Sequence, residues 1–412
     1  MGVIETFRSV VQFKPIELDP VERRLAKAAS VADLRKQAKR RLPAGVFDYI
    51  DGGAEDELTL ARNSGGYSRF EFKPRILRDV SKIDTGTTLL GKPIPIPLVF
   101  APTGFTRIAD PQGELAVARA AARAGIPYGL STMGTRSIEE VAAVSDGPKW
   151  FQVYTWRDRG MVRDLLERSA AAGFEAIQLT VDTAVLGRRE RDVRRGYTLP
   201  PKVGLSTIID GMIHPAWTID FLRNEPITFA SVAANNTAGD GSSAITLSQY
   251  INSQFDPALS WAEIDWLRSV WDGPIVVKGI QTVADAELAV EHGVDAIALS
   301  NHGGRQLDGA PSVIDLVEPV AQRVGGQIDI IADGGARRGS DIVKAVALGA
   351  TAVMAGRPYL YALGAAGERG VDHLIDMFVE GMERTMALTG CQQISDITRE
   401  LVRRVDGPAD DR

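Results

Sequence analysis

Residues 300–308 read Ser-Asn-His-Gly-Gly-Arg-Gln-Leu-Asp, which puts a histidine and an arginine three residues apart. The imidazole of His302 can accept a proton near neutral pH. The guanidinium of Arg305 can hold a carboxylate through two parallel hydrogen bonds. The two glycines between them allow the backbone to come close to a ligand. A base beside a fixed cation suits proton transfer on a small carboxylate.

His302 needs support, because a lone histidine more often has a structural role than a catalytic one. Two features favour catalysis. Arg305 is close in sequence, and the apolar run before residue 300 predicts a buried strand that ends there. Asp182 follows another predicted strand. It could bond the second imidazole nitrogen, orient the ring and stabilise its protonated form.

Strands and helices that alternate along the chain must position these residues. From about residue 98, short apolar runs alternate with amphipathic stretches, which is typical of parallel βαβ units. We expect eight strands, over residues 98–101, 128–132, 150–154, 176–181, 275–278, 296–300, 328–332 and 352–355. We expect helices between most of them, including 113–124, 138–144, 161–172, 283–292 and 342–348. Eight units predict an α/β fold, a closed (β/α)8 TIM barrel. A doubly wound open sheet is the alternative, but it usually has fewer strands.

Two segments fall outside this pattern. Residues 1–97 are predicted to be an N-terminal extension with one clear helix, around 31–41, and residues 98–390 to be the barrel, followed by a C-terminal tail over 391–412. Residues 190–258, after the fourth strand, are too long for an ordinary connection and predict a lid-like loop. It contains a polar tract at 235–243 and an apolar, aromatic patch at 212–222. We expect the patch to pack on the barrel rim, with a membrane or partner contact as the alternative.

The composition is that of an ordinary globular protein, with 44% apolar and 24% charged residues. A net charge of −6 gives no indication of nucleic-acid binding. Cys391 is the only cysteine, which excludes an intrachain disulfide and a multi-cysteine metal site. The chain has no signal segment and no apolar run of the ~18–20 residues that cross a bilayer. We therefore expect a cytoplasmic enzyme without a metal, with peripheral contact at the inner membrane face through 212–222 left open.

Active sites of TIM barrels form at the C-terminal ends of the strands, and polar residues gather at those positions here. In strand order they are Pro102, Thr103 and Gly104; Ser131; Gln152 and Tyr154; Thr180, Asp182 and Arg189; Lys278; Ser300, His302 and Arg305; Asp333, Gly334, Gly335 and Arg337; and Gly356 and Arg357. A lysine at the end of a buried strand usually extends its amine to water. Lys278, however, points to the face where Gln152 and Thr180 gather. This set could hydrogen-bond a flat heterocycle, with the lysine stabilising negative charge on it.

The loops after the seventh and eighth strands are typical of a phosphate site. Their glycines can offer free backbone N–H groups, and Arg337 and Arg357 can add charge. The structural alternative is that the glycines only make tight turns. A phosphorylated substrate and a phosphate-bearing cofactor would satisfy the site equally well.

Together these residues resemble the FMN-dependent 2-hydroxy acid oxidase and dehydrogenase family, which includes glycolate oxidase, lactate oxidase and monooxygenase, mandelate dehydrogenase and flavin-linked L-lactate dehydrogenases. The resemblance runs from about residue 31 to residue 396, and its most specific motif is 300–306 with Asp308. Supporting motifs lie at 47–49, 52–58, 101–103, 151–154, 180–183, 186–189, 278–279, 333–339 and 356–358. In character the chain is most similar to bacterial L-lactate dehydrogenases.

The resemblance implies FMN as the cofactor and a role for each site residue. His302 would be the base and Asp182 its partner. Arg305, Arg189 and Tyr49 would hold the substrate carboxylate, with Tyr154 at the hydroxyl. The N-terminal extension would cap the barrel and bring Tyr49 over its mouth. The residues implied to contact FMN are Pro102, Thr103, Gly104, Ser131, Gln152, Thr180, Lys278, Ser300, Asp333, Gly334, Gly335, Arg337, Gly356 and Arg357. Relatives also imply a homotetramer.

The implied reaction oxidises an L-2-hydroxy acid, with L-lactate the leading substrate, to a 2-keto acid. Sequence leaves open whether the base removes the hydroxyl proton or the Cα proton. Met133 stands where glycolate oxidase-like members carry a bulky aromatic residue, which weakens the case for glycolate. No cytochrome-like domain precedes the barrel, so we expect electrons to pass to oxygen, a quinone or a separate carrier.

Several other functions remain as alternatives. Within the family these are a mandelate-type dehydrogenase and a lactate oxidase or monooxygenase. Outside it, an FMN-dependent isomerase or a phosphosugar aldolase could use the same phosphate loops, and an aldolase would make Lys278 a Schiff-base nucleophile. The His302 and Arg305 pair argues against an aldolase and against a non-catalytic scaffold. Nicotinamide dependence is disfavoured, because no Gly-x-Gly-x-x-Gly follows an early strand.

Overall fold

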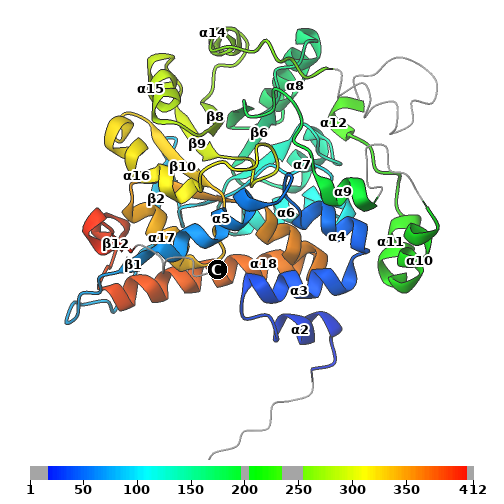
Figure 1. Ribbon diagram of the computed structural model, residues 1–412, viewed down its shortest axis with the longest axis horizontal. Coiled ribbons are helices and arrows are strands. Elements are labelled where there is room, and N and C mark those ends of the chain that lie inside the picture. Colours follow the sequence, from blue (N-terminus) through cyan, green and yellow to red (C-terminus); the bar gives the residue numbers. More distant parts are fainter. Residues whose placement is uncertain (1–16, 196–203, 234–253, 406–412) are drawn as a thin grey trace, which may run out of the picture.

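A computed structural model describes residues 17–195, 204–233 and 254–405 of the protein (Figure 1). Eight parallel strands close into a barrel, in the order β10-β11-β4-β5-β6-β7-β8-β9. They are β4 (Leu98–Phe100), β5 (Tyr128–Ser131), β6 (Lys149–Val153), β7 (Ala176–Thr180), β8 (Ile275–Ile280), β9 (Ala296–Ser300), β10 (Asp329–Asp333) and β11 (Ala352–Ala355). The predicted (β/α)8 barrel is therefore confirmed.

The strands form where the sequence has short apolar runs, because both faces of a parallel sheet are covered. Every residue of β4, β5, β6, β7, β9 and β11 is buried. The strand register then places polar residues side by side at the C-terminal ends. Ser131 pairs with Gln152, Thr180 with Lys278, and Ser300 with Asp333.

Helices surround the barrel. They are α6 (Glu114–Arg123), α7 (Ile138–Val144), α8 (Arg159–Ala171), α14 (Ala262–Arg268), α15 (Val283–Glu291), α16 (Val313–Val324), α17 (Gly339–Ala347) and α18 (Arg357–Thr389). Local caps fix several starts, and Ser137 forms a reciprocal capping box with Glu140 at α7. The long helix α18 is kinked at Ala366 and Gly367, and Gly367 has a φ of +63°.

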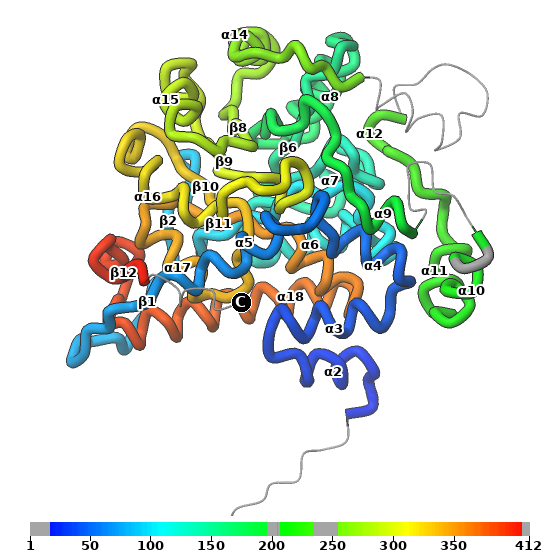
Figure 2. The backbone as a smooth tube through the Cα atoms, in the orientation of Figure 1, coloured from blue at the N-terminus to red at the C-terminus, as the bar shows by residue number. Residues whose placement is uncertain are grey.

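The described part of the N-terminal extension, residues 17–97, holds four α-helices, whereas the sequence pattern indicated one. They are α2 (Pro20–Leu25), α3 (Val31–Arg41), α4 (Ala44–Asp51) and α5 (Leu58–Gly66). Figure 2 shows α3 lying along α18. The start of α5 is capped from far away in sequence, because Asp308 accepts from the backbone N–H groups of Leu58 (3.2 Å) and Thr59 (2.8 Å). No local pattern could have revealed that cap.

Short strands and 3-10 turns lie outside the barrel. Strand β1 (Phe70–Phe72) pairs antiparallel with β12 (Val402–Arg404), and β2 (Thr87–Leu89) pairs with β3 (Lys92–Ile94). Short 3-10 turns are η1 (Tyr67–Arg69), η2 (Thr106–Ile108), η3 (Ile394–Asp396) and η4 (Arg399–Leu401).

The long connection after β7 contains α9 (Glu190–Arg195), α10 (Leu205–Ile213), α11 (Pro215–Arg223) and α12 (Ala230–Ala233). Helices α10 and α11 form a hairpin at the edge of the molecule (Figure 1). The polar tract predicted at 235–243 lies outside the described residues. Within the described ranges, no helix combines the length and apolar character needed to cross a membrane.

Candidate active site

A cavity opens at the C-terminal ends of the barrel strands, with a volume of about 1310 Å³ when space open to solvent is counted. Its lining contains every candidate site residue except Asp182 and Ser300. Those two lie directly behind the lining. The fold thus brings together residues that are up to 308 positions apart in the chain, from Tyr49 to Arg357.

His302 and Asp182 form a pair on neighbouring loops. His302 Nδ1 lies 2.9 Å from Asp182 Oδ1. The backbone of His302 has a φ of +58°, a left-handed conformation that is uncommon for residues other than glycine and is often found at active sites. Gln306 joins the two loops, because its amide donates to the carbonyl oxygens of Asp182 (3.0 Å) and Val185 (2.9 Å).

The electrostatics of this pair favour a neutral imidazole beside a carboxylate. Burial lowers the pKa of His302, and Asp182 opposes that change only in part. Burial would raise the pKa of Asp182, but His302 and Lys278 outweigh it, so the pKa falls below its ordinary value. His302 can therefore accept a proton, and Asp182 can stabilise the imidazolium that results.

Two arginines lie beside the histidine. Arg305 donates to the carbonyl oxygens of Tyr49 (2.7 Å) and Gly52 (3.0 Å), and its guanidinium carbon lies 5.0 Å from the centre of the Tyr49 ring. Burial, with Arg189 close by, lowers the pKa of Arg305 to about 9. The buried Nε of Arg189 has no hydrogen-bond partner among the described residues. These cations are poised to hold an anionic group that enters the cavity.

Asp192 is a buried carboxyl near this pair that sequence reasoning missed. Its residue is 9% exposed, and burial raises its pKa although Arg305 and Arg189 oppose the change. Asp192 lies on α9 within the long connection, where no strand-end pattern could mark it.

Lys278, Ser300 and Asp333 form a compact polar cluster at the base of the cavity. Lys278 Nζ lies 2.9 Å from Asp333 Oδ2 and 3.1 Å from Ser300 Oγ. Ser300 Oγ in turn donates to Asp333 Oδ2 at 2.7 Å. Burial disfavours the charged amine, but Asp333 and Asp182 outweigh it and raise the pKa of Lys278. The amine is thus a fixed, buried positive charge rather than a neutral nucleophile, which disfavours the aldolase alternative.

Gln152 supplies a test of whether the cavity suits a flat heterocycle. Its Oε1 accepts from Ser131 Oγ at 2.9 Å, while its buried Nε2 has no partner in the described part of the chain. A buried amide donor without a partner is costly unless a ligand accepts from it. Thr180 and Lys278 line the same cavity. This set of donors fits the oxygens and nitrogens of an isoalloxazine ring.

The glycines in the loops after β10 and β11 differ in what the structure requires of them. A Cβ on Gly335 would come within 1.9 Å of the Asn63 carbonyl oxygen, so this glycine is needed for the contact with α5. A Cβ on Gly356 would make only ordinary contacts, the nearest at 3.5 Å. Arg357 donates to the carbonyl oxygens of Ile50 (3.1 Å), Gly52 (2.6 Å) and Gly303 (2.8 Å). It therefore fastens the N-terminal extension to the barrel while its charge remains at the cavity.

Four aromatic residues of the cavity lining, which we call the aromatic wall, are Tyr49, Phe105, Tyr154 and Phe255, and two of them, Phe105 and Phe255, went unnoticed in the sequence. The rings of Phe105 and Tyr49 meet edge to face with centroids 6.0 Å apart, as do those of Phe255 and Tyr154 at 5.2 Å. Met133 also lines the cavity. In the sequence this residue stands out because it occupies a position where glycolate oxidase-like members carry an aromatic residue. Phe105 follows the Thr103-Gly104 motif closely, and this was the one available signal.

Comparison with known proteins agrees with this geometry. Residues 38–404 match the family model described as FMN-dependent dehydrogenase. A Mycobacterium tuberculosis protein with the provisional name L-lactate dehydrogenase is 48% identical over 94% of this chain and 92% of its own length. Glycolate oxidase of Spinacia oleracea is 43% identical over 90% of this chain and 95% of its own.

Solved structures give the same result. The crystal structure of the monotopic membrane protein (S)-mandelate dehydrogenase superposes with a TM-score of 0.88 and 38% identity. It covers 92% of this chain and 100% of its own. The matched family, the relatives and the donor set of the cavity agree, and the chain belongs to the FMN-dependent dehydrogenase family.

Proposed function

We propose that this protein oxidises L-lactate to pyruvate, with FMN as its cofactor and His302 as its base. The observation that carries the proposal is the His302–Asp182 pair, at 2.9 Å, beside Arg305 and Arg189 in one cavity. FMN-dependent oxidation of 2-hydroxy acids is the chemistry of the family, and L-lactate is the substrate in the names of two relatives. One of them, from Caulobacter sp. (strain K31), is 40% identical over 92% of this chain.

In the proposed reaction, Arg305 and Arg189 bind the substrate carboxylate and fix the reacting carbon, with Tyr49 beside them. This is mainly a proximity effect. Tyr154 hydrogen-bonds the substrate hydroxyl. His302 takes a proton from that hydroxyl or from Cα, and Asp182 stabilises the imidazolium.

The cofactor would lie along the cavity. Pro102, Thr103, Gly104, Ser131, Gln152 and Thr180 would contact its ring system, and Lys278 would face the part that becomes negative. Ser300 and Asp333 would contact the ribityl chain. Gly334, Gly335, Arg337, Gly356 and Arg357 would hold the phosphate. When bound, FMN accepts the two electrons that the substrate loses.

A larger substrate of the mandelate type is the second candidate, and the aromatic wall favours it. Phe105, Phe255 and Met133 line the cavity and could pack against a phenyl ring. A solved mandelate oxidase is 37% identical to this chain, covers 93% of it and 100% of its own, and superposes with a TM-score of 0.79.

Anaerobic mixing of the FMN-loaded protein with single acids tests the proposal. L-lactate should bleach the flavin absorbance faster than L-mandelate or glycolate, and D-lactate should leave it unchanged. Faster bleaching by L-mandelate would favour the second candidate. A flavoprotein that none of these acids bleaches would contradict both.

We further propose that α10 and α11 contact a membrane and that the electron acceptor is a quinone within it. Among the side chains of this hairpin whose burial is described, five apolar ones are each more than half exposed. They are Ile208 (53%), Ile209 (52%), Met212 (73%), Ile213 (69%) and Leu222 (75%), and we call them the hairpin surface. Exposed apolar side chains gathered on one element are typical of a membrane or partner contact. The structural relative (S)-mandelate dehydrogenase is itself a monotopic membrane protein.

A further inference from the structure

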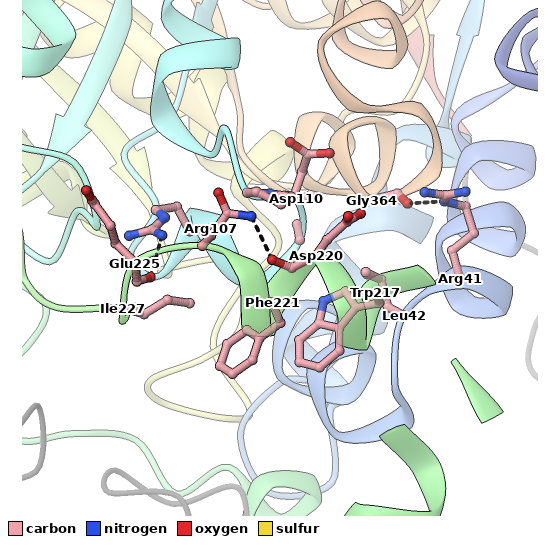
Figure 3. Close-up of a pocket in the computed structure, with 13 residues that line it drawn as sticks. Arg41, Leu42, Arg107, Asp110, Trp217, Asp220, Phe221, Glu225, Ile227 and Gly364 are labelled. Carbon is pink, nitrogen blue, oxygen red and sulfur yellow. Dashed lines mark hydrogen bonds between the residues drawn. The ribbon is translucent and has the colours of Figure 1, made fainter. Parts of the chain in front are cut away.

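A second pocket lies between α11 and the barrel, outside the cavity described above (Figure 3). Its volume is about 470 Å³ when space open to solvent is counted. We call it the rim pocket and define it by the side chains that carry the argument. They are Arg41, Arg107, Asp110, Trp217, Asp220 and Phe221. No residue of this set also lines the active-site cavity.

Two aromatic rings form one wall of the rim pocket. Trp217 and Phe221 are stacked, with ring centroids 4.9 Å apart and planes at 15°. Trp217 is held in place because its Nε1 donates to the Ile108 carbonyl oxygen at 2.8 Å. Phe221 remains 43% exposed. Because the two rings face each other, another ring can stack only on the outer face of the pair.

Cations enter the pocket from opposite sides. In Figure 3, Arg107 and Arg41 approach from either side of the two rings. Arg107 is only 7% exposed, and its Nη2 donates to the Glu225 carbonyl oxygen at 2.7 Å. Its buried Nε has no hydrogen-bond partner within the described chain. A buried donor of this kind requires an acceptor from outside the chain or from water.

Acidic side chains lie between the two arginines. Burial raises the pKa of Asp110, and the nearby Asp220 adds to the effect while Arg41 opposes it. With Glu225, which also lines the pocket, Asp110 and Asp220 set three carboxyl groups against the two guanidinium groups. This excess of acidic groups disfavours an anion such as a lipid phosphate, and the pocket favours a neutral ligand that accepts hydrogen bonds.

The rim pocket is close to the active-site cavity. Leu360 lines the cavity and Gly364 lines the rim pocket, and both lie in the first turns of α18. Four residues of helix correspond to a rise of about 6 Å. Phe105 lines the cavity and Arg107 lines the rim pocket, and the two residues are only two positions apart in the chain.

We propose that the rim pocket binds the ring of the quinone that accepts the electrons. The ring would stack on the outer face of the Trp217–Phe221 pair, and a carbonyl oxygen would accept a hydrogen bond from Arg107. Its apolar tail would leave toward the hairpin surface, because Trp217 and Phe221 lie on α11, the helix that also carries Leu222. Asp110 or Asp220 would relay a proton to the reduced oxygen.

This inference rests on the proposed function, which supplies the electrons. The hydroxy acid gives up two electrons and two protons and becomes a keto acid. The quinone takes two electrons and two protons and becomes a quinol. The sum is hydroxy acid plus quinone giving keto acid plus quinol, so atoms and charge balance.

Photolabelling tests the site without using activity. A short-chain azido-benzoquinone, irradiated with the FMN-loaded protein, should attach to the segment 215–223, and excess ubiquinone-1 should prevent the attachment. Attachment confined to the active-site cavity would overturn the proposal. So would labelling of 215–223 that anionic phospholipid vesicles displace and ubiquinone-1 does not, because that pattern assigns the pocket to a lipid headgroup.

A rate ratio provides the second test. The FMN-loaded protein, reduced anaerobically with dithionite, is mixed with ubiquinone-1 or with ferricyanide, which needs no ring pocket. In Phe221→Ala we expect the ratio of the quinone rate to the ferricyanide rate to fall at least tenfold. The matched control is Ile219→Ala, on the same helix with a similar exposed fraction of 45% and outside the pocket lining.

Equal ratios in the two variants would overturn the proposal. Because dithionite replaces the substrate, these results do not depend on which acid the enzyme oxidises. Failure of every acid to bleach the flavin would contradict the proposed function alone, whereas equal ratios would contradict the rim pocket alone.

Discussion

His302 controls the proposed reaction at the scale of single residues, because it must be neutral to take a proton. Burial lowers its pKa, so the neutral form predominates above the ordinary value near 6.5 and is lost only in more acidic solution. The rate of FMN reduction should therefore be constant above neutral pH as far as His302 is concerned, and should fall as the pH drops below its pKa.

Asp182→Asn changes both the rate and this pH dependence. We expect FMN reduction by L-lactate to slow by on the order of 10³-fold, because the imidazolium loses its partner. Asp182 raises the pKa of His302 against burial, so its loss should move the acid limb of the rate profile to lower pH. Stopped-flow reduction between pH 5 and 9 measures both effects. A slowed variant with an unmoved acid limb would contradict the assigned pair.

Arg305→Lys tests the substrate contact. A lysine keeps the positive charge but lacks the planar fork that can hold a carboxylate through two parallel hydrogen bonds. We expect the Kd for L-lactate, taken from the concentration dependence of reduction, to rise roughly 10- to 100-fold, as loss of a charge-assisted bond implies. Arg188→Lys is the matched control, since Arg188 is exposed and outside the cavity lining. Equal Kd values in the two variants would remove Arg305 from carboxylate binding.

The sequence was informative about residues that stand at strand ends. His302, Lys278 and Gln152 follow apolar runs whose ends were easy to locate, and the barrel brings all such ends to one face. Phe105, Phe255 and Asp192 lie in loops or in the long connection, where no periodic pattern indicates a direction. Their place in the site depends on tertiary packing, which a single sequence does not reveal.

At the scale of helices and strands, the sequence likewise predicts elements that a local pattern defines and misses those that distant contacts stabilise. The barrel strands are buried on both faces, so their ends agree with the predicted ranges to within two residues. Helices α4 and α5 were missed because contacts from distant parts of the chain stabilise them. Asp308 caps α5, and Asp51 at the end of α4 bonds Arg35 (2.5 Å), Arg191 (2.9 Å) and Tyr361 (2.8 Å).

Asp51→Asn should loosen this junction of α3, α4, α9 and α18. Burial opposes ionisation of Asp51, but Arg35, Tyr361 and Arg191 outweigh it and lower the pKa to about 2. The carboxylate therefore stabilises the fold above its ordinary pKa near 4, and that contribution is lost as the pH falls toward 2. A shift of this size corresponds to about 2 kcal/mol at pH 7.

The Tm of Asp51→Asn at pH 7 should be a few degrees below that of the wild type, and the difference should shrink between pH 5 and pH 3. Tyr361→Phe is the control. It removes only one hydrogen bond to the Asp51 carboxylate, worth about 1 kcal/mol, and leaves the carboxylate and both arginines in place, so its difference should change much less with pH in this range. A constant difference for Asp51→Asn would show that its carboxylate carries no pH-linked stability.

At the scale of the whole molecule, the hairpin of α10 and α11 joins two proposals. Its outer side chains form the hairpin surface, and its inner rings form part of the rim pocket. The apolar patch expected at 212–222 is thus divided, since Trp217 bonds the barrel rim while Met212 and Ile213 are exposed. Packing on the rim is confirmed for Trp217, while the membrane contact of the exposed side chains stays a proposal. The sequence pattern does not tell which face of a short helix meets the barrel.

Ile213→Asp tests the membrane contact. A charge in place of a 69% exposed isoleucine should reduce co-sedimentation with phospholipid vesicles at least tenfold, because an apolar contact worth about 1.5–3 kcal/mol is lost and a charge must be dehydrated. The matched control is Leu388→Asp on α18, which changes the net charge equally at a residue that is 70% exposed. Equal binding of the two variants would contradict the hairpin surface.

The central claim is that His302 removes the proton when an L-2-hydroxy acid reduces the bound FMN. Anaerobic stopped-flow mixing of L-lactate with wild type and with His302→Ala tests it most directly, after absorbance spectra have shown equal FMN content. We predict rapid bleaching in the wild type and a rate reduced by at least 10³-fold in the variant. A His302→Ala protein that retains its FMN and is bleached at the wild-type rate would contradict the account.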